Sequence, residues 1–172
     1  MKTKITALGA MLTALGVTMM YLGAVTDVLD LSMCALASFI CTFALLEFGV
    51  GYALSVSTAT LLLSLMLLPS KIVAFEYALM AAYMILKPRI ERLDRIFAWL
   101  IKLLYINASL VLGLLAAKYV FMLPDDGIWI NVSFVALGNV AFVLFDLACT
   151  KLIILYVYRL RKRLNIEKYL KR

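Results

Sequence analysis

Residues 5–25, ITALGAMLTALGVTMMYLGAV, form an apolar run without a charged residue near the start of the chain. A helix that crosses a bilayer needs about 20 mostly apolar residues, so this run is long enough for one crossing. Lys2 and Lys4 precede it, and Asp27 and Asp30 follow it. A cleaved signal peptide begins in the same way, but the apolar pattern continues through the chain and no clear A-x-A cleavage signal follows. We therefore predict a retained membrane-spanning helix.

The composition extends this prediction to the whole chain. Of its 172 residues, 66% are hydrophobic and 16% are charged, and the mean hydropathy is +1.04. Soluble domains are about half apolar and about a quarter charged, and a small soluble fold could not bury this much apolar surface. The net charge of +7 comes from residues at the ends of apolar runs, not from a basic face that would bind nucleic acid. We predict an integral membrane protein, solvated by the lipid bilayer, without a nucleic-acid partner.

Six apolar runs divide the chain, and we predict that each is a transmembrane helix. They cover residues 5–25, 31–46, 52–68, 72–86, 96–123 and 128–158, and turn or charged residues separate them. No repeat or linker divides the chain, so the predicted fold is one all-α, six-transmembrane-helix bundle over residues 1–172. The fourth run is the shortest and contains Glu76, so a re-entrant pair is the alternative there.

Lysine and arginine predict the orientation, because cytoplasmic connectors are enriched in them. Basic residues precede the first run, follow the fourth and fill the tail at about 159–172. Asp27, Asp30, Asp125 and Asp126 lie in the connectors of the opposite side, where Lys71 is the one basic residue. Six crossings keep these two sets apart, whereas five or seven would mix them. We expect both termini in the cytoplasm and, since the cysteines show no disulfide pattern, a multi-pass protein of a bacterial plasma membrane.

The sequence carries no motif for catalysis or metal binding. It has no histidine, and Cys34, Cys41 and Cys149 lie inside apolar runs, where cysteine behaves as a small hydrophobe. The H-E-x-x-H, G-x-S-x-G and P-loop signatures of metalloproteases, serine hydrolases and ATPases are missing. We predict no enzyme activity, no metal and no cofactor, so any energy from ATP would come from another subunit.

Polar residues inside the apolar runs are the candidates for function, because a charge in the membrane is costly. Glu76 and Lys118 lie in the outer parts of the fourth and fifth runs, where they either neutralise each other or line an outward-facing cavity. Asn131 and Asn139 share one face of the sixth run with Asp146. An amide needs several partners in hydrocarbon, which makes Asn139 the best uncharged candidate. We predict that Glu76, Lys118, Asn131 and Asn139 bind a small-molecule substrate.

The deeper charges have a different expected role. Asp146, Lys102 and Lys151 lie toward the cytoplasmic half of the fifth and sixth runs. A buried ion pair neutralises charge inside a bundle, so we predict that Asp146 pairs with Lys102 for structural reasons.

Small residues mark one helix as a packing surface. Gly9, Gly16 and Gly23 recur every seven residues in the first run, and Ala10 and Ala14 lie beside the first two. Small residues let helix backbones approach closely in lipid. Packing inside the bundle is the simple interpretation; the alternative is that one small stripe faces inward and another docks a separate protein.

The segment 4–14, KITALGAMLTA, joins a basic start to an A-x-x-x-A pair in the first helix. With six predicted crossings, cytoplasmic ends, small size and a basic tail, the chain resembles the substrate-binding S-component of an energy-coupling-factor (ECF) vitamin transporter. In that family the alanine face docks on a coupling membrane protein that sits on two ATPases, which implies that Ala10 and Ala14 are the docking residues. The resemblance also implies that a vitamin-like solute binds near the outer surface, under the connectors at 25–30, 68–71 and 123–127. The subunit would then rotate in the membrane to release it inward.

The substrate stays open, because the motifs of the biotin, thiamine, riboflavin and folate members are absent and the lack of histidine argues against nickel or cobalt. Two alternatives also stay open: a membrane scaffold or assembly protein, and a small ion- or proton-coupled carrier. An outer cavity lined by the polar candidates would favour binding, and pairing among them without a void would favour a scaffold. A polar path from Glu76 to Asp146 would favour a carrier.

Overall fold

The computed structural model of the chain describes residues 2–26, 29–119 and 128–160, with side chains except at residues 2, 4, 117, 128–132 and 160. These residues form six α-helices and one π-helical turn, and they contain no strand. The all-helical prediction is therefore confirmed for this part of the chain. The elements are α1 (Lys2–Thr26), α2 (Asp30–Phe48), α3 (Val50–Leu67), α4 (Lys71–Ile90), α5 (Arg95–Tyr119), α6 (Ile128–Leu155) and η1 (Tyr156–Leu160).

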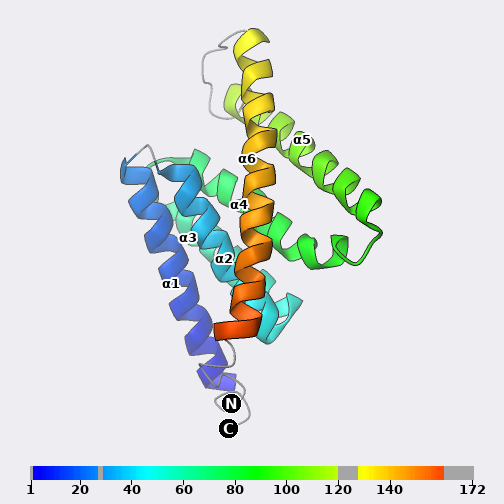
Figure 1. Cartoon of the computed structure of the whole chain (residues 1–172). Helices are drawn as coiled ribbons and strands as arrows, with labels where there is room; N and C mark the ends of the chain where they lie inside the picture. The colour runs from blue at the N-terminus through cyan, green and yellow to red at the C-terminus, as the bar shows by residue number, and fades with distance from the viewer. Residues whose placement is uncertain (1, 27–28, 120–127, 161–172) are drawn as a thin grey trace.

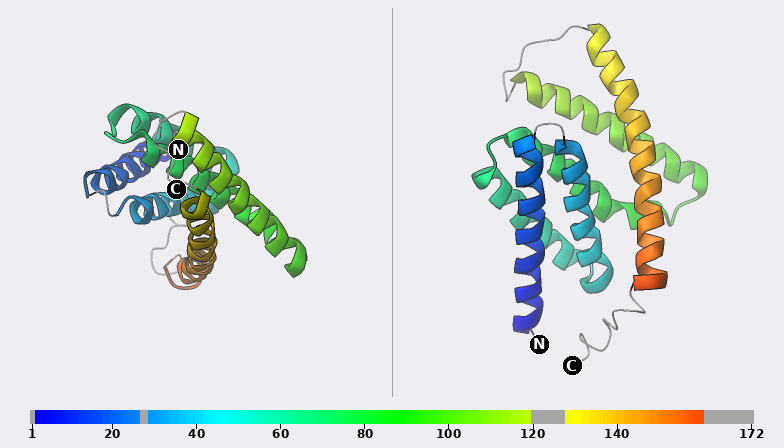
Figure 2. Two further views of the ribbon diagram at one scale, coloured as in Figure 1. Left: turned by 90° about the horizontal axis from the view of Figure 1, so that it is seen from above. Right: turned by 60° about the vertical axis from the view of Figure 1, so that its left-hand side comes forward.

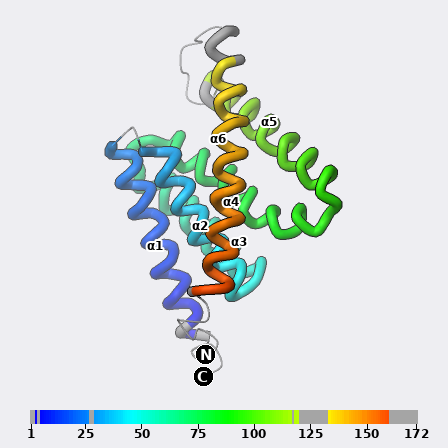
Figure 3. The backbone as a smooth tube through the Cα atoms, in the orientation of Figure 1, coloured from blue at the N-terminus to red at the C-terminus, as the bar shows by residue number. Residues whose placement is uncertain are grey.

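Helices α1 to α4 pack together as a bundle, and α5 and α6 flank it (Figure 1). Helix α2 contacts α1, α3 and α4, while α5 packs against α4 and α6. Helix α5 lies oblique to α6 in the views of Figures 1 and 2. Figure 3 shows that α1 begins and η1 ends at one end of the bundle. Helix α1 ends and α2 begins at the other end, which we call the Asp30 end.

Five of the helices, α1, α2, α3, α5 and α6, are long and apolar enough to cross a membrane. Helix α4 does not meet that criterion. Its sequence is less apolar, and its position in the bundle accounts for this difference. It packs against α2, α3 and α5, and Tyr77, Tyr83 and Lys87 are among its buried residues. Polar groups in a membrane are tolerated where they face protein rather than lipid. The structure thus confirms a bundle suited to several membrane crossings, with five helices rather than six meeting the criterion of length and composition.

Helix α4 also extends beyond residue 86, where the predicted fourth run ends. The sequence places Lys87 in a cytoplasmic connector, but its side chain is 0% exposed and α4 continues past Pro88 to Ile90. That placement was wrong because the side chains of Asp146 and Thr150 on α6 supply partners for the ammonium group. A buried charge with such partners no longer needs water.

The glycines of α1 face the neighbouring helices. A methyl group added at Gly16 would approach Thr60 Cγ2 of α3 to 3.1 Å, and one added at Gly23 would approach Met33 Cβ of α2 to 2.9 Å. Gly9 is buried as well. Any larger side chain would push these helices apart, so the seven-residue spacing marks the surface on which α1 packs. The alanines of the predicted docking pair lie on an exposed side of α1.

Large apolar side chains cover the outside of the bundle. Met11, Met66, Ile96 and Leu137, from four different helices, are each between 70% and 80% exposed. Large apolar side chains exposed on four helices are what lipid tails would cover. The three cysteines, in contrast, are free and buried inside the bundle.

Candidate functional site

A cavity of about 740 Å³ opens between α2, α4, α5 and α6. Its volume falls within the range of about 300–1,000 Å³ that is usual for small-molecule sites. Most of its wall is apolar or aromatic, with a few polar side chains. The aromatic members are Tyr83, Tyr105, Phe134, Phe142 and Phe145, and the other polar members are Asp30, Ser32, Glu76 and Ser109.

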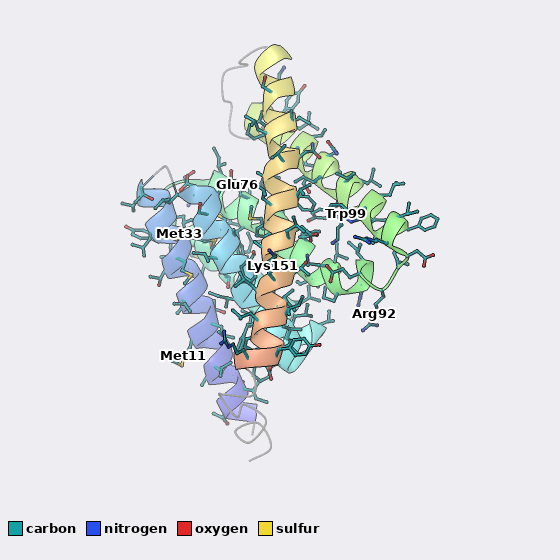
Figure 4. All side chains as sticks on the ribbon, in the orientation of Figure 1. Met11, Met33, Glu76, Arg92, Trp99 and Lys151 are labelled. Atoms are coloured by element: carbon teal, nitrogen blue, oxygen red, sulfur yellow. The ribbon has the colours of Figure 1, made fainter. Side chains whose placement is uncertain are left out.

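Glu76 reaches the cavity from the second turn of α4, toward the Asp30 end and away from the α4–α5 connection that Arg92 marks (Figure 4). Its carboxylate oxygen Oε2 is buried and has no hydrogen-bond partner among the described residues. Asp30, the first residue of α2, also lines the cavity and acts electrostatically on Glu76. Burial of a carboxylate oxygen without a donor is destabilising. The cavity therefore holds an acidic group suited to a hydrogen-bond donor that these residues do not provide.

Two tyrosines lie side by side in the wall of the cavity. The rings of Tyr83 and Tyr105 lie 5.5 Å apart between centroids, and Phe142 meets Tyr83 edge-on at 4.8 Å. Tyr105 donates its hydroxyl hydrogen to the carbonyl of Leu79 at 2.7 Å. Tyr83 instead donates to Oδ1 of Asp146, below the cavity. This part of the wall is thus aromatic, and the Tyr83 hydroxyl joins it to Asp146, which is not among the lining residues.

Asp146 lies at the centre of a buried charge network. Its side chain is 3% exposed, and Oδ1 accepts from Lys87 and Tyr83 while Oδ2 accepts from Lys102 at 2.8 Å. The predicted pair between Asp146 and Lys102 is confirmed. Oε1 of Glu91 lies 3.2 Å from Nζ of Lys87 and 3.3 Å from Nζ of Lys102, so two carboxylates balance two ammonium groups. With its charges balanced and its donors used, the network ties α4, α5 and α6 together.

Three members of this network were missed from the sequence. Tyr83, Lys87 and Glu91 are spaced four residues apart, which places them on one face of α4. That spacing was the available signal, but the charges at 87 and 91 also fit the end of a span and a cytoplasmic connector. The pattern becomes informative only when the opposite carboxylate of Asp146 is known to lie beside it.

Asn139 is placed away from the cavity lining and forms an amide pair with Asn107 of α5. Asn107 donates to Asn139 Oδ1 at 3.2 Å, and Asn139 donates to Asn107 Oδ1 at 3.1 Å. Each amide also donates to a backbone carbonyl of its own helix, that of Leu103 or Val135. This reciprocal pair gives Asn139 the partners that an amide needs in hydrocarbon.

The remaining predicted site residues lie apart from this cavity or outside the described side chains. Lys118 is in the last turn of α5 and is exposed, and the cavity lining does not include it. Asn131 falls in the first part of α6, where the backbone is described and the side chain is not. Of the four predicted substrate-binding residues, the structure brings Glu76 alone to the described cavity wall.

The predicted docking pair lines a second hollow. A groove of about 560 Å³ runs between α1 and α3, and both Ala10 and Ala14 are on its wall. Gly9 and Thr13 of α1 are buried beside them, and Tyr52 and Val56 come from α3. The two alanines therefore combine exposure with a recess into which the side chains of another helix could fit.

None of the families, curated proteins or solved structures compared with the chain matches it.

Among the described residues there is no group of three or more histidine, cysteine, aspartate or glutamate side chains placed to hold a metal ion. Function is therefore inferred from the residues and the geometry of the two hollows.

Proposed function

We propose that this chain is the substrate-binding subunit of an ATP-driven small-molecule uptake transporter of the ECF type, embedded in the plasma membrane. The observation that carries the proposal is the cavity between α2, α4, α5 and α6, which contains Glu76 and has the size of a small-molecule site. A bundle whose role was only structural would gain by filling such a space, because an unfilled void loses packing contacts.

The second support is the arrangement of small residues on α1. The glycines face α2 and α3, while Ala10 and Ala14 are exposed on the wall of the groove. One small stripe thus serves packing within the chain and the other is available to a partner. Close contact through alanines needs no specific polar bonds, which suits a surface that must attach and release.

In the proposed mechanism the solute enters the cavity from the Asp30 end, which faces outward in the predicted topology. The chain then docks through Ala10 and Ala14 on a coupling membrane protein and turns in the bilayer so that the cavity opens inward. ATP hydrolysis takes place in two ATPase subunits. The chain itself contributes binding and a docking face, and it needs no cofactor.

Co-purification tests this function. A tagged chain is extracted from its native membrane with a mild detergent, and the expected result is recovery of a coupling membrane protein with two ATPases. Replacing Ala10 and Ala14 by leucine fills the groove and should remove these partners. The matched control replaces Ala136 and Ala148, which are exposed on α6, by leucine and should retain them. Recovery of the chain alone, or equal recovery from both double variants, argues against the docking face.

A proton-coupled carrier is the second candidate, because one observation favours it. The cavity runs from Glu76 to Tyr83, and Tyr83 hydrogen-bonds to Asp146, so titratable groups lie at both ends of one path. Uptake by such a carrier should stop when the proton gradient is collapsed and should persist when ATP is depleted. The ECF-type proposal expects the reverse dependence. A scaffold role is supported by the asparagines that pair inside the bundle. It predicts no uptake, and so no dependence on the proton gradient or on ATP.

A further inference from the structure

We propose that the cavity binds an organic cation, an ammonium group carried on an apolar or aromatic body, with the ammonium at Glu76. This inference rests on the proposed function as a binding subunit and names the class of its substrate. It follows from the charge, the shape and the unmet hydrogen-bonding of the cavity wall.

The charge of the wall is negative. Among the described lining residues the carboxyl side chains are those of Asp30 and Glu76, and no lysine or arginine is included. The buried lysines of the described residues, Lys87 and Lys102, are paired with Asp146 and Glu91. A carboxylate or phosphate ligand would meet like charge at short range in a medium of low dielectric, whereas an ammonium group would meet opposite charge.

The hydrogen-bonding of Glu76 points the same way. Its Oε2 atom is buried without a donor among the described residues. An ammonium group carries up to three N–H donors and no acceptor, so it supplies what this oxygen lacks. Hydrogen bonds between charged partners are the stronger class, and in this site they would also remove the cost of the buried carboxylate.

The rest of the wall suits an apolar body. The rings of Tyr83 and Tyr105 are tilted at 39° to each other, Phe142 meets Tyr83 edge-on, and all three residues line the cavity. Aromatic faces attract cations and stack on planar rings. Ser109, from α5, is one of the few uncharged polar groups of the wall. A purely hydrophilic cation would leave this surface unmatched.

The experiment compares three ligands that share a body and differ in charge: tryptamine, a cation at neutral pH; tryptophol, which is neutral; and indole-3-propionate, an anion. Binding to the full chain in dodecyl maltoside, a detergent without an ammonium group, is measured by calorimetry. We expect tryptamine to bind more tightly than the other two. Glu76→Gln should weaken tryptamine binding roughly 10- to 100-fold, the loss of one charge-assisted contact. Glu47→Gln, the same change at a residue outside the cavity lining, should leave the affinity unchanged.

A second variant separates the cavity from the detergent surface. Ala35→Phe introduces a ring into the cavity wall and should abolish tryptamine binding, while a thermal melt reports that the variant is folded. Phosphatidylethanolamine carries the same ammonium chemistry on a lipid, so it is added in a competition arm. Displacement of tryptamine by this lipid identifies a lipid headgroup as the source of the cation, and binding that is unaffected identifies a soluble amine.

Three results overturn the inference. If indole-3-propionate or tryptophol binds as tightly as tryptamine, the ligand class is wrong, but a small molecule still binds and the proposed function stands. If none of the three binds, the cavity is not a site for such ligands, and the proposed function is then judged by its co-purification test alone. Tryptamine binding that Glu76→Gln does not weaken places the cation elsewhere and also refutes the inference.

Discussion

Replacing Asp146 by asparagine is the most informative single perturbation of the buried charge network. The Asp146 side chain is 3% exposed and accepts from Tyr83, Lys87 and Lys102. Without it, Glu91, whose side chain is 38% exposed, is the one carboxylate that these described contacts leave to the two buried ammonium groups. Removing one partner of a buried ion pair costs about 3–5 kcal/mol. For a chain of this length such a loss lowers the unfolding midpoint by roughly 6 to 20 °C.

The three buried cysteines provide the assay. Their thiols are shielded in the folded chain and become reactive on unfolding, so a thiol-reactive fluorophore follows thermal unfolding of the full chain in detergent. The control is Asp94→Asn, the same substitution at an exposed position between α4 and α5. It removes an equal charge without touching the network, so its midpoint should stay within a few degrees of the parent protein.

A rescue variant makes the test specific to charge balance. Lys87→Met combined with Asp146→Asn removes one charge of each sign and leaves Lys102 beside Glu91 at 3.3 Å. We expect this double variant to be more stable than Asp146→Asn alone, because it no longer buries an excess ammonium group. The reasoning is refuted if Asp146→Asn melts with the parent, or if the double variant is as unstable as the sum of its two single changes.

Two further predictions concern helix packing. Asn139→Leu should lower the free energy of unfolding by about 1 kcal/mol, because it leaves Asn107 without its reciprocal amide, and a denaturant titration should show recovery when Asn107 is changed to leucine as well. Gly23→Ala should cost about 1–3 kcal/mol, because the added methyl group meets the Cβ of Met33 at 2.9 Å. Gly113→Ala, which has open space around it, serves as its control in the same thermal assay and should be neutral or slightly stabilising. Equal effects at the two glycines would contradict the packing argument.

The helices could be predicted well because the bilayer imposes a length and a polarity on each of them. The six predicted runs correspond to α1 through α6, and five satisfy the criterion of length and composition for a span. Prediction failed at the end of α4, where Lys87 resembles the first residue of a basic connector. The sequence shows that a residue is charged, but it does not show whether water or another side chain stabilises that charge.

The candidate site could be predicted only in part. Glu76 was selected because a carboxylate in an apolar run is costly unless it has a function, and it does line the cavity. Asn139 was selected because a polar side chain in an apolar run is costly. Its partner Asn107 lies on another helix, and helical periodicity relates residues only within one helix, so the pair could not be predicted. The contributions of Tyr83, Tyr105 and the phenylalanines were not predicted, because aromatic residues are common in any membrane helix.

By itself the sequence determined the all-helical class of the protein, the approximate limits of the six α-helices in the described residues, and the small face on which α1 packs. These properties follow from local composition and spacing, since each helix meets the lipid or its neighbour through residues that repeat along it. Tertiary structure decided which polar groups satisfy each other and which of them line a cavity. That outcome depends on the rotation and offset of each helix relative to the others. Lys87 and Asn139 find partners across the bundle, whereas Glu76 faces the space between four helices.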